Sequence, residues 1–482
     1  MMRAPAAVLA PVAVLAACFL LALSSRCALG APTVPPPVAQ AIAGERIAPP
    51  GVSYVVLDVE SGQIAASLNP GTPRRPASTI KVVTTFAALD SLGPAYTWHT
   101  VALLQGVLED GVLQGDLILK GGGDPYMTLE RWWSFVQALR AKGLRTLHGD
   151  IVIDDTAFAL LPEDPAAFDG RPHQAYNAEP SALMVNFQSV EFRLMPNAGT
   201  RRVDIAATPA PVNLAIDNGI GLTAGPCNGR AARVAFEVPS AEWDRVVFSG
   251  SLSPQCAARS ITRVLLSAPS YAFGTFVQLW RESGGIFDGT WRVAAAPPTA
   301  TPFVSFDSVT LAEAVRLTNK FSNNLMARHL LLTLGAERFG APATLDKGIR
   351  ALSAWSQERG LALSDMQIDN GSGLSRTTRI SALELAAVLR AAYHSRYAPE
   401  FVASLPLGGV DGTLRSRLQG AQPGSVRLKT GHLDGVSGIA GYVTGGSGKV
   451  YVVVSLVNDA RVGAGAGDGV HEALVGWTQA AL

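Results

Sequence analysis

Residues 78–81, Ser-Thr-Ile-Lys, carry a hydroxyl and an amine at a spacing that could support nucleophilic catalysis. They form the only Ser-x-x-Lys of the chain, with Pro76 just ahead and an apolar run with helical spacing behind. Ser and Pro favour first-turn positions, so the pattern predicts a helix that begins at or near Ser78. Lys81 would then lie on the same helix face, one turn from the Ser78 hydroxyl. A desolvated lysine there could lose its proton near neutral pH and activate the serine.

The same four residues also fit a structural interpretation without chemistry. A serine at a helix start usually caps the helix, and a lysine one turn later is usually solvated. Taken alone, the motif favours this second interpretation, so the rest of the sequence has to decide between the two.

Two further motifs combine hydroxyl, amide and amine groups. Residues 322–324, Ser-Asn-Asn, lie in an apolar helical context, where buried polar side chains need partners that a substrate amide could supply. Residues 429–431, Lys-Thr-Gly, occur once, on a predicted strand. Each motif is weak by itself, because residues 67–69 also form a Ser-x-Asn triplet and an edge strand often carries a solvated lysine.

The composition describes a large, weakly charged chain. Its 482 residues are too many for one ordinary core and predict two or three domains. The chain is 48% hydrophobic and 16% charged, with a formal net charge of +1. No basic excess is present, so the composition argues against a nucleic-acid partner.

The first 30 residues have the pattern of an export signal. An apolar segment follows Arg3, and small residues near Ala31 fit signal cleavage at that point. A lipoprotein signal at Cys18 and an uncleaved membrane anchor remain as alternatives. Once the signal is removed, only Cys227 and Cys256 remain, and in an exported protein this pair predicts one disulfide.

Both chain ends supply strand patterns, while a helical region precedes the C-terminal strands. Strands are predicted over residues 54–59, 64–68, 426–430, 438–443 and 451–456, and helices over 309–334, 341–359 and 381–393. The Pro-rich residues 33–37 are expected to be a flexible lead-in. This layout predicts one sheet built from both chain ends, with a helical cluster against it.

The three motifs, taken in order, resemble a known fingerprint. Ser-x-x-Lys, then Ser-x-Asn, then Lys-Thr-Gly is typical of penicillin-recognising serine acyl enzymes. The chain resembles the D-alanyl-D-alanine carboxypeptidase/endopeptidases of the penicillin-binding protein 4 type, peptidase family S13. In that family two extra domains fill the gap between the first two motifs, which is about 240 residues here. Further stretches that are similar to the family lie at residues 121–125, 176–183, 369–376 and 411–414.

The resemblance implies an α/β (α+β) fold of the penicillin-binding-protein and β-lactamase type. Its transpeptidase domain, an antiparallel sheet with helices on both faces and a helical cluster, would comprise residues 38–98 and 303–482. A large insertion would interrupt it and form two smaller domains: an α/β domain at 99–184 and 264–302, and a nested β-rich domain at 185–263.

The resemblance also implies a catalytic role for each motif. Ser78 would attack the carbonyl between two D-alanines of a peptidoglycan stem peptide, and Lys81 would take the serine proton. Ser322 and Lys429 would relay a proton to the leaving amine. Water would then hydrolyse the acyl-enzyme.

Four more positions would bind the substrate: Asn324, Thr430, Gly431 and His432. Asn324 would hold the substrate amide and Thr430 the terminal carboxylate. The backbone N–H groups of Ser78 and His432 would form the oxyanion hole. The family usually has Ser or Thr where this chain has His432, and the sequence leaves open whether the imidazole replaces that hydroxyl or points away.

No cofactor or metal is implied, and His471-Glu472 lacks the second histidine of an H-E-x-x-H site. The implied partners are peptidoglycan stem peptides and β-lactam antibiotics as covalent inhibitors, in the periplasm. Peripheral membrane association and a homodimer stay open. A β-lactamase or Ser-x-x-Lys esterase would share the motifs and differ in substrate. A silent cell-wall-binding scaffold is the alternative from another class.

Overall fold

The computed structural model describes residue 1 and residues 34–463 and 465–482. The predicted export signal, residues 1–30, therefore lies outside the described residues except for Met1. Among the described helices, none has both the length and the apolar character that a membrane crossing requires.

A five-stranded antiparallel sheet joins the two ends of the chain. Its order is β16-β17-β18-β1-β2. The strands are β1 (Val52–Asp58), β2 (Ile64–Leu68), β16 (Val426–Leu433), β17 (Val436–Thr444) and β18 (Val450–Asn458). Val55 of the first strand lies opposite Val454 of the last. The sheet predicted from both chain ends is thereby confirmed.

The two faces of this sheet are covered by different helices. Side chains alternate along a strand, so Tyr54 and Val56 enter one apolar core while Val55 and Leu57 enter the other. The first core is shared with α2 (Pro36–Gly44) and α11 (Asp468–Ala481), and the second with α3 (Lys81–Leu92) and α9 (Ala382–Tyr393). The flexible lead-in predicted over residues 33–37 is wrong at its C-terminal end. Helix α2 starts at Pro36 because Pro suits a first turn and Val38 is fully buried.

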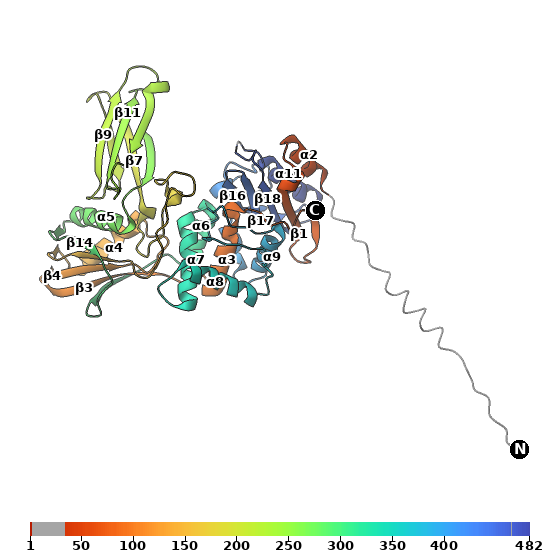
Figure 1. Ribbon diagram of the computed structural model, residues 1–482, viewed down its shortest axis with the longest axis horizontal. Coiled ribbons are helices and arrows are strands. Elements are labelled where there is room, and N and C mark those ends of the chain that lie inside the picture. The colour runs from red at the N-terminus through yellow and green to blue at the C-terminus, as the bar shows by residue number, and fades with distance from the viewer. Residues whose placement is uncertain (2–33, 464) are drawn as a thin grey trace.

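A helical cluster packs on the α3 side of the sheet (Figure 1). It consists of α6 (Leu311–Phe321), α7 (Asn324–Phe339), α8 (Leu345–Glu358) and α10 (Ala398–Ser404). The continuous helix predicted over residues 309–334 is wrong, because Ser322 adopts a left-handed φ of 57° and ends α6. The Asn323 side chain then accepts a hydrogen bond from the Met326 N–H, 3.0 Å, and starts α7.

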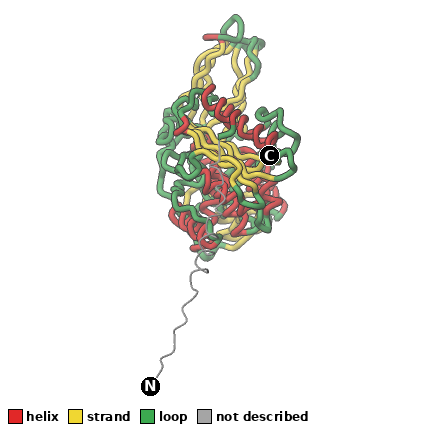
Figure 2. Tube along the Cα trace, turned by 90° about the vertical axis from the view of Figure 1, so that its right-hand side faces the viewer, coloured by secondary structure: helices red, strands yellow, loops and turns green. Residues whose placement is uncertain are grey.

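The chain between α3 and α6 forms three more sheets. A seven-stranded sheet contains β3 (His99–Glu109), β4 (Val112–Lys120), β5 (Thr146–Leu147), β6 (Ile151–Asp154), β13 (Ile286–Phe287), β14 (Trp291–Val293) and β15 (Thr301–Asp307), with α4 (Leu129–Ala141) and α5 (Ala268–Glu282). Two three-stranded sheets contain β7 (Ser189–Asn197), β8 (Arg202–Thr208), β9 (Ala215–Leu222), β10 (Ala232–Glu237), β11 (Arg245–Leu252) and β12 (Arg259–Val264). In Figure 2 these smaller sheets extend away from the rest of the molecule.

One apolar core runs through the seven-stranded sheet and the two smaller ones. Trp132 of α4, Phe192 of β7 and Phe248 of β11 all belong to it. The predicted disulfide between Cys227 and Cys256 is present and joins two loops that connect strands of the smaller sheets. Because this core is continuous, the separation of residues 185–263 as a nested domain stays a prediction.

Candidate active site

Ser78 lies in a 3₁₀ turn, Ala77–Ile80, directly ahead of α3. The helix predicted to begin at Ser78 therefore begins three residues later, and no side chain caps its first turn. Thr79 holds the turn by donating its hydroxyl to the Pro76 carbonyl, 2.7 Å. The turn packs against β16 and β17 of the five-stranded sheet.

The Lys81 side chain is completely buried and points at Ser78. Its Nζ donates to Ser78 Oγ at 2.9 Å, to Asn324 Oδ1 at 2.7 Å and to the Ser372 carbonyl at 2.5 Å. All three acceptors are neutral, so none supplies a counter-charge for a buried ammonium. Burial first, and the charge of Lys429 second, hold the pKa of Lys81 well below its usual value. The solvated-lysine interpretation is wrong.

Lys429 is a second fully buried amine at the same site. Its Nζ donates to Ser322 Oγ at 2.8 Å and to the Thr430 carbonyl at 2.7 Å. Burial lowers the pKa of Lys429 to about 7. The site therefore holds two serine–lysine pairs, and the charge of Lys429 disfavours protonation of Lys81.

The break between α6 and α7 positions two of the predicted site residues, Ser322 and Asn324. The left-handed Ser322 directs its hydroxyl to Lys429, and Asn324 begins the next helix. The Asn324 amide accepts from Lys81 and donates to the Tyr176 carbonyl at 3.3 Å. A continuous helix could not offer both groups in this way, because Asn323 between them has to serve as the cap.

Strand β16 runs close against the Ser78 turn. A Cβ atom at Gly431 would lie 2.7 Å from the Pro76 carbonyl oxygen and 3.0 Å from the Ser78 nitrogen, so only glycine fits. Thr430 donates its hydroxyl to that of Thr413, 2.7 Å. His432 is exposed, and its imidazole has no hydrogen bond to any residue that the structure describes.

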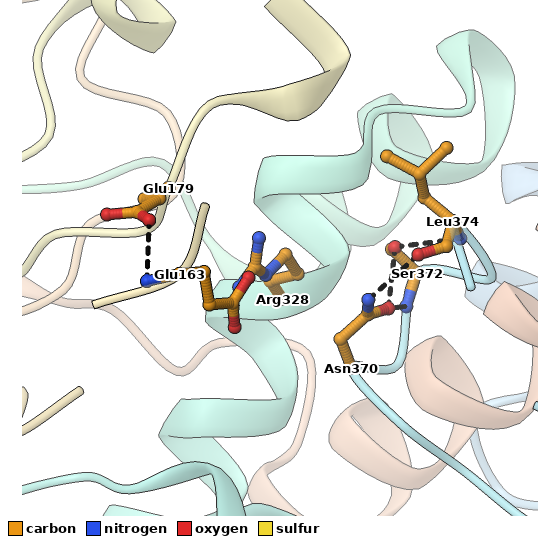
Figure 3. A network of polar contacts seen from close by, with 6 residues as sticks. All are labelled: Glu163, Glu179, Arg328, Asn370, Ser372 and Leu374. Carbon is orange, nitrogen blue, oxygen red and sulfur yellow. Dashed lines mark hydrogen bonds and ion pairs between the residues drawn. The ribbon is translucent and has the colours of Figure 1, made fainter. Parts of the chain in front are cut away.

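A loop that sequence reasoning did not assign to the site lies against the same turn. It supplies the Ser372 carbonyl that accepts from Lys81. Figure 3 shows how Asn370 holds Ser372: its Oδ1 accepts from the Ser372 N–H at 3.1 Å and hydroxyl at 2.8 Å. Gly373, with φ 81°, leaves no room for a Cβ beside the Ala77 carbonyl. The family-like run at residues 369–376 was the available signal, but it does not indicate a backbone acceptor.

A second unassigned group is an ion pair behind the site, in which Lys320 is buried and Asp411 is partly exposed. Lys320 Nζ contacts both carboxylate oxygens of Asp411, at 2.9 and 2.7 Å, and the Leu405 carbonyl at 2.7 Å. This pair ties the end of α6, next to Ser322, to the loop that carries Thr413. Burial opposes ionisation of Asp411, but backbone hydrogen bonding at Leu407 and Lys320 outweigh it and lower the pKa.

A cavity of about 460 Å³ lies beside these groups, with Ser372, Tyr176 and Arg376 in its wall. Within the described residues, no group of three or more His, Cys, Asp or Glu side chains is placed to hold a metal ion. A nucleophilic hydroxyl with a buried amine partner, a second hydroxyl–amine pair and a carboxamide can carry out acyl transfer. The structure thus brings Ser78, Lys81, Ser322, Asn324 and Lys429 together, with residues 430–432 on the adjoining strand.

Comparison with known proteins gives a consistent result. The sequence model of the D-Ala-D-Ala carboxypeptidase 3 (S13) family matches residues 37–481. The D-alanyl-D-alanine carboxypeptidase of Actinomadura sp. (strain R39) is 30% identical over 427 residues, covering 85% of this chain and 78% of the relative. Penicillin-binding protein 4 of Haemophilus influenzae has a similar crystal structure, with a TM-score of 0.73 at 24% identity, covering 88% of this chain and 93% of that one. A second crystal structure of that protein, complexed with a β-lactam, gives a TM-score of 0.71 at 24% identity, covering 89% and 94%.

Proposed function

This chain belongs to the D-Ala-D-Ala carboxypeptidase 3 (S13) family and is a serine-type carboxypeptidase, and from that premise we propose that it works through an acyl-enzyme on Ser78. The substrate is a peptidoglycan stem peptide that ends in two D-alanines. One observation carries the assignment: a fully buried lysine with a lowered pKa donates a hydrogen bond to the Ser78 hydroxyl at 2.9 Å.

Acylation begins with a proton transfer from Ser78 to Lys81. A neutral Lys81 amine takes the hydroxyl proton as Oγ bonds to the carbonyl carbon between the two D-alanines. The C–N bond then breaks, and the leaving amine receives a proton through the Ser322 hydroxyl, which Lys429 contacts at 2.8 Å. Water hydrolyses the resulting ester, which releases the shortened peptide and restores the serine.

The oxyanion of the tetrahedral intermediate is stabilised by the backbone N–H groups of Ser78 and His432. Each such donor contributes roughly 3–4 kcal/mol in comparable sites. The close approach of Gly431 to the Ser78 nitrogen supports this assignment, because it holds strand and turn at a fixed separation.

Substrate binding uses part of the outer edge of β16. Residues 406–408 hydrogen-bond to this edge at Val426 and Leu428, and the edge from Thr430 onward can pair with an extended peptide. Asn324 holds the substrate amide, while Thr430 and a charged Lys429 receive the terminal carboxylate. A β-lactam, which also presents a carboxylate and a reactive carbonyl, acylates the same serine.

Export through residues 1–30 places the enzyme in the periplasm, next to its polymer substrate. Cross-linked stem peptides contain a D-Ala–diaminopimelate bond of the same kind, so the proposal includes endopeptidase cleavage. Nothing in the described residues supports peripheral membrane association or a homodimer, and neither belongs to the proposal.

Labelling of the mature protein with a fluorescent penicillin tests the assignment. The wild-type protein should bind one label per chain, Ser78→Ala should bind none, and Ser447→Ala, in an exposed turn, should label normally. D-Ala release from a stem pentapeptide should be lost only in Ser78→Ala. Labelling of Ser78→Ala would disprove the proposed nucleophile. Rapid turnover of the penicillin would instead support the β-lactamase alternative.

A further inference from the structure

A cavity of about 840 Å³ lies apart from the acyl-transfer site. One wall is the bridging segment, residues 155–182, which connects the end of β6 to the loops before β7. The lining also contains Trp243, the start of α5 and Trp291 of β14. Ser78 and Lys81 are not in its lining, and the proposed mechanism makes no use of it. Its volume is in the range of ligand sites.

The wall combines aromatic rings with hydrogen-bond acceptors. The two indoles, Trp243 and Trp291, are both partly exposed. Asp155 and Glu179 supply carboxylates to the same space, and Ser181 supplies a hydroxyl. Flat apolar rings beside carboxylates suit a ligand with an apolar ring face and several hydroxyl donors.

Three residues of this wall have a strained backbone. Gln188, Trp243 and Leu266 all line the cavity, and all have a left-handed φ, of 54°, 59° and 67°. Side chains of this size rarely adopt that conformation, and such strain is found preferentially at ligand-binding and active sites. The Leu266 N–H donates to the Trp243 carbonyl at 3.2 Å, so the two strained residues hold one another.

The cavity shares a wall with the smaller one beside the acyl-transfer site. Glu163, Pro165 and Arg328 line both. Arg328 contacts both carboxylate oxygens of Glu163 at 2.8 Å, and the Glu163 N–H donates to Glu179 Oε1 at 2.9 Å. Figure 3 shows Arg328 between this pair of glutamates and the loop of Ser372. A ligand long enough to pass this partition would occupy both cavities.

We propose that the larger cavity binds the amino-sugar strand of the peptidoglycan whose stem peptide enters the acyl-transfer site. This rests on the proposed function, since it takes the same polymer as substrate. The lining holds four carboxylates, of Asp155, Glu163, Glu179 and Glu242, and one cation, Arg328. A stem peptide with free carboxylates would be repelled there, whereas a neutral sugar ring can stack on the indoles and donate hydroxyls to the carboxylates.

Binding can be measured without catalysis. Uncharged oligomers of N-acetylated amino sugar, which carry neither peptide nor free carboxylate, are titrated by calorimetry into the full mature chain carrying Ser78→Ala. We expect saturable binding, weakened about fivefold or more by Trp243→Ala or Trp291→Ala, since one aromatic contact contributes that much. Trp133→Ala is the matched control, because Trp133 is 51% exposed and lies outside the cavity. No binding, or equal binding by all variants, would overturn the proposal.

Kinetics with the active enzyme provide the second measurement. The KM for a disaccharide-linked pentapeptide should be about fivefold or more below that for the free pentapeptide, and Trp291→Ala should remove this difference. Acylation by fluorescent penicillin reports folding, since penicillin carries no sugar. If neither tryptophan variant is acylated by penicillin, the KM values of the two substrates are compared in Glu179→Gln instead. Tighter binding of a sugar-free, amine-bearing peptide than of the oligomer would also overturn the proposal. If the wild-type protein binds the oligomer but neither labels with penicillin nor releases D-Ala, the assignment of Ser78 fails and the sugar site stands.

Discussion

A single methyl group at Gly431 should disable the enzyme while leaving most of the fold intact. In Gly431→Ala the new Cβ would meet three backbone atoms: the Pro76 oxygen at 2.7 Å, the Thr79 nitrogen at 2.9 Å and the Ser78 nitrogen at 3.0 Å. Ordinary contacts begin at 3.4 Å, so strand and turn must separate by about 0.7 Å at the closest point. Backbone atoms cannot rotate aside, so the Ser78 turn itself has to move.

The size of the effect follows from that displacement. A misplacement of about 1 Å at reacting groups costs on the order of 100-fold in rate, so acylation should slow roughly 30- to 100-fold. Overpacking of a close contact costs about 1–3 kcal/mol in the free energy of unfolding. The assay is the second-order rate constant for acylation by a fluorescent penicillin, with urea unfolding measured in parallel.

Gly476→Ala is the matched control for the added methyl group. Gly476 lies in α11, and a Cβ there would meet nothing within 4 Å. Because glycine weakens a helix interior, this variant should gain about 0.5–1 kcal/mol of stability and acylate at the wild-type rate. Wild-type acylation by Gly431→Ala would refute the reasoning, because the close contact would then not position Ser78.

Three further outcomes are expected. Asn324→Asp should slow acylation at least about tenfold, because a carboxylate near Lys81 Nζ raises the pKa of Lys81 and keeps the base for Ser78 protonated. Asn323→Asp, which preserves the α7 cap, should change the rate less than about twofold. The kcat/KM for a carboxylate substrate should fall as the pH rises through about 7, because Lys429 then loses its charge. A kcat/KM that stays constant from pH 6 to 9 would contradict this expectation. Between about pH 7 and 10.5, Lys429 binds more protons in the unfolded state than in the folded state, so the free energy of unfolding of the wild type should rise with pH. In urea unfolding, Lys429→Met should lower the slope of this rise by up to about 1.4 kcal/mol per pH unit.

The five-stranded sheet could be predicted because its strands are dense apolar runs. The side chains of residues 451–456 alternate between two apolar cores, so both faces of this strand are apolar and the sequence shows a dense apolar run. The break at Ser322 could not be predicted, since the apolar pattern continues across it. A left-handed φ at one serine is fixed by tertiary contacts, here the hydrogen bond from Lys429 and the cap at Asn323.

For the site, the order of three motifs predicted which residues would meet. The structure brings Lys81 within hydrogen-bond distance of Ser78 and Asn324, and Lys429 within hydrogen-bond distance of Ser322. Their environment could not be predicted in the same way. The Ser372 carbonyl is a backbone atom, so no residue type identifies it as an acceptor for Lys81. The burial of Lys81 also needs residues from α7 and the loop of Ser372, which lie about 240 and 290 positions away in the sequence.

The histidine that departs from the family pattern has a physical explanation. The His432 side chain is exposed and hydrogen-bonds to no described residue, while its backbone is fixed by pairing with Ser437 on β17. An oxyanion donor at this position is a backbone N–H, which every residue except proline supplies. The neighbouring position is different, because Gly431 contacts the Ser78 turn through the space that a Cβ would occupy. The strand therefore constrains the side chain at 431 and only the backbone at 432, which favours the interpretation in which the imidazole points away from the reacting atoms.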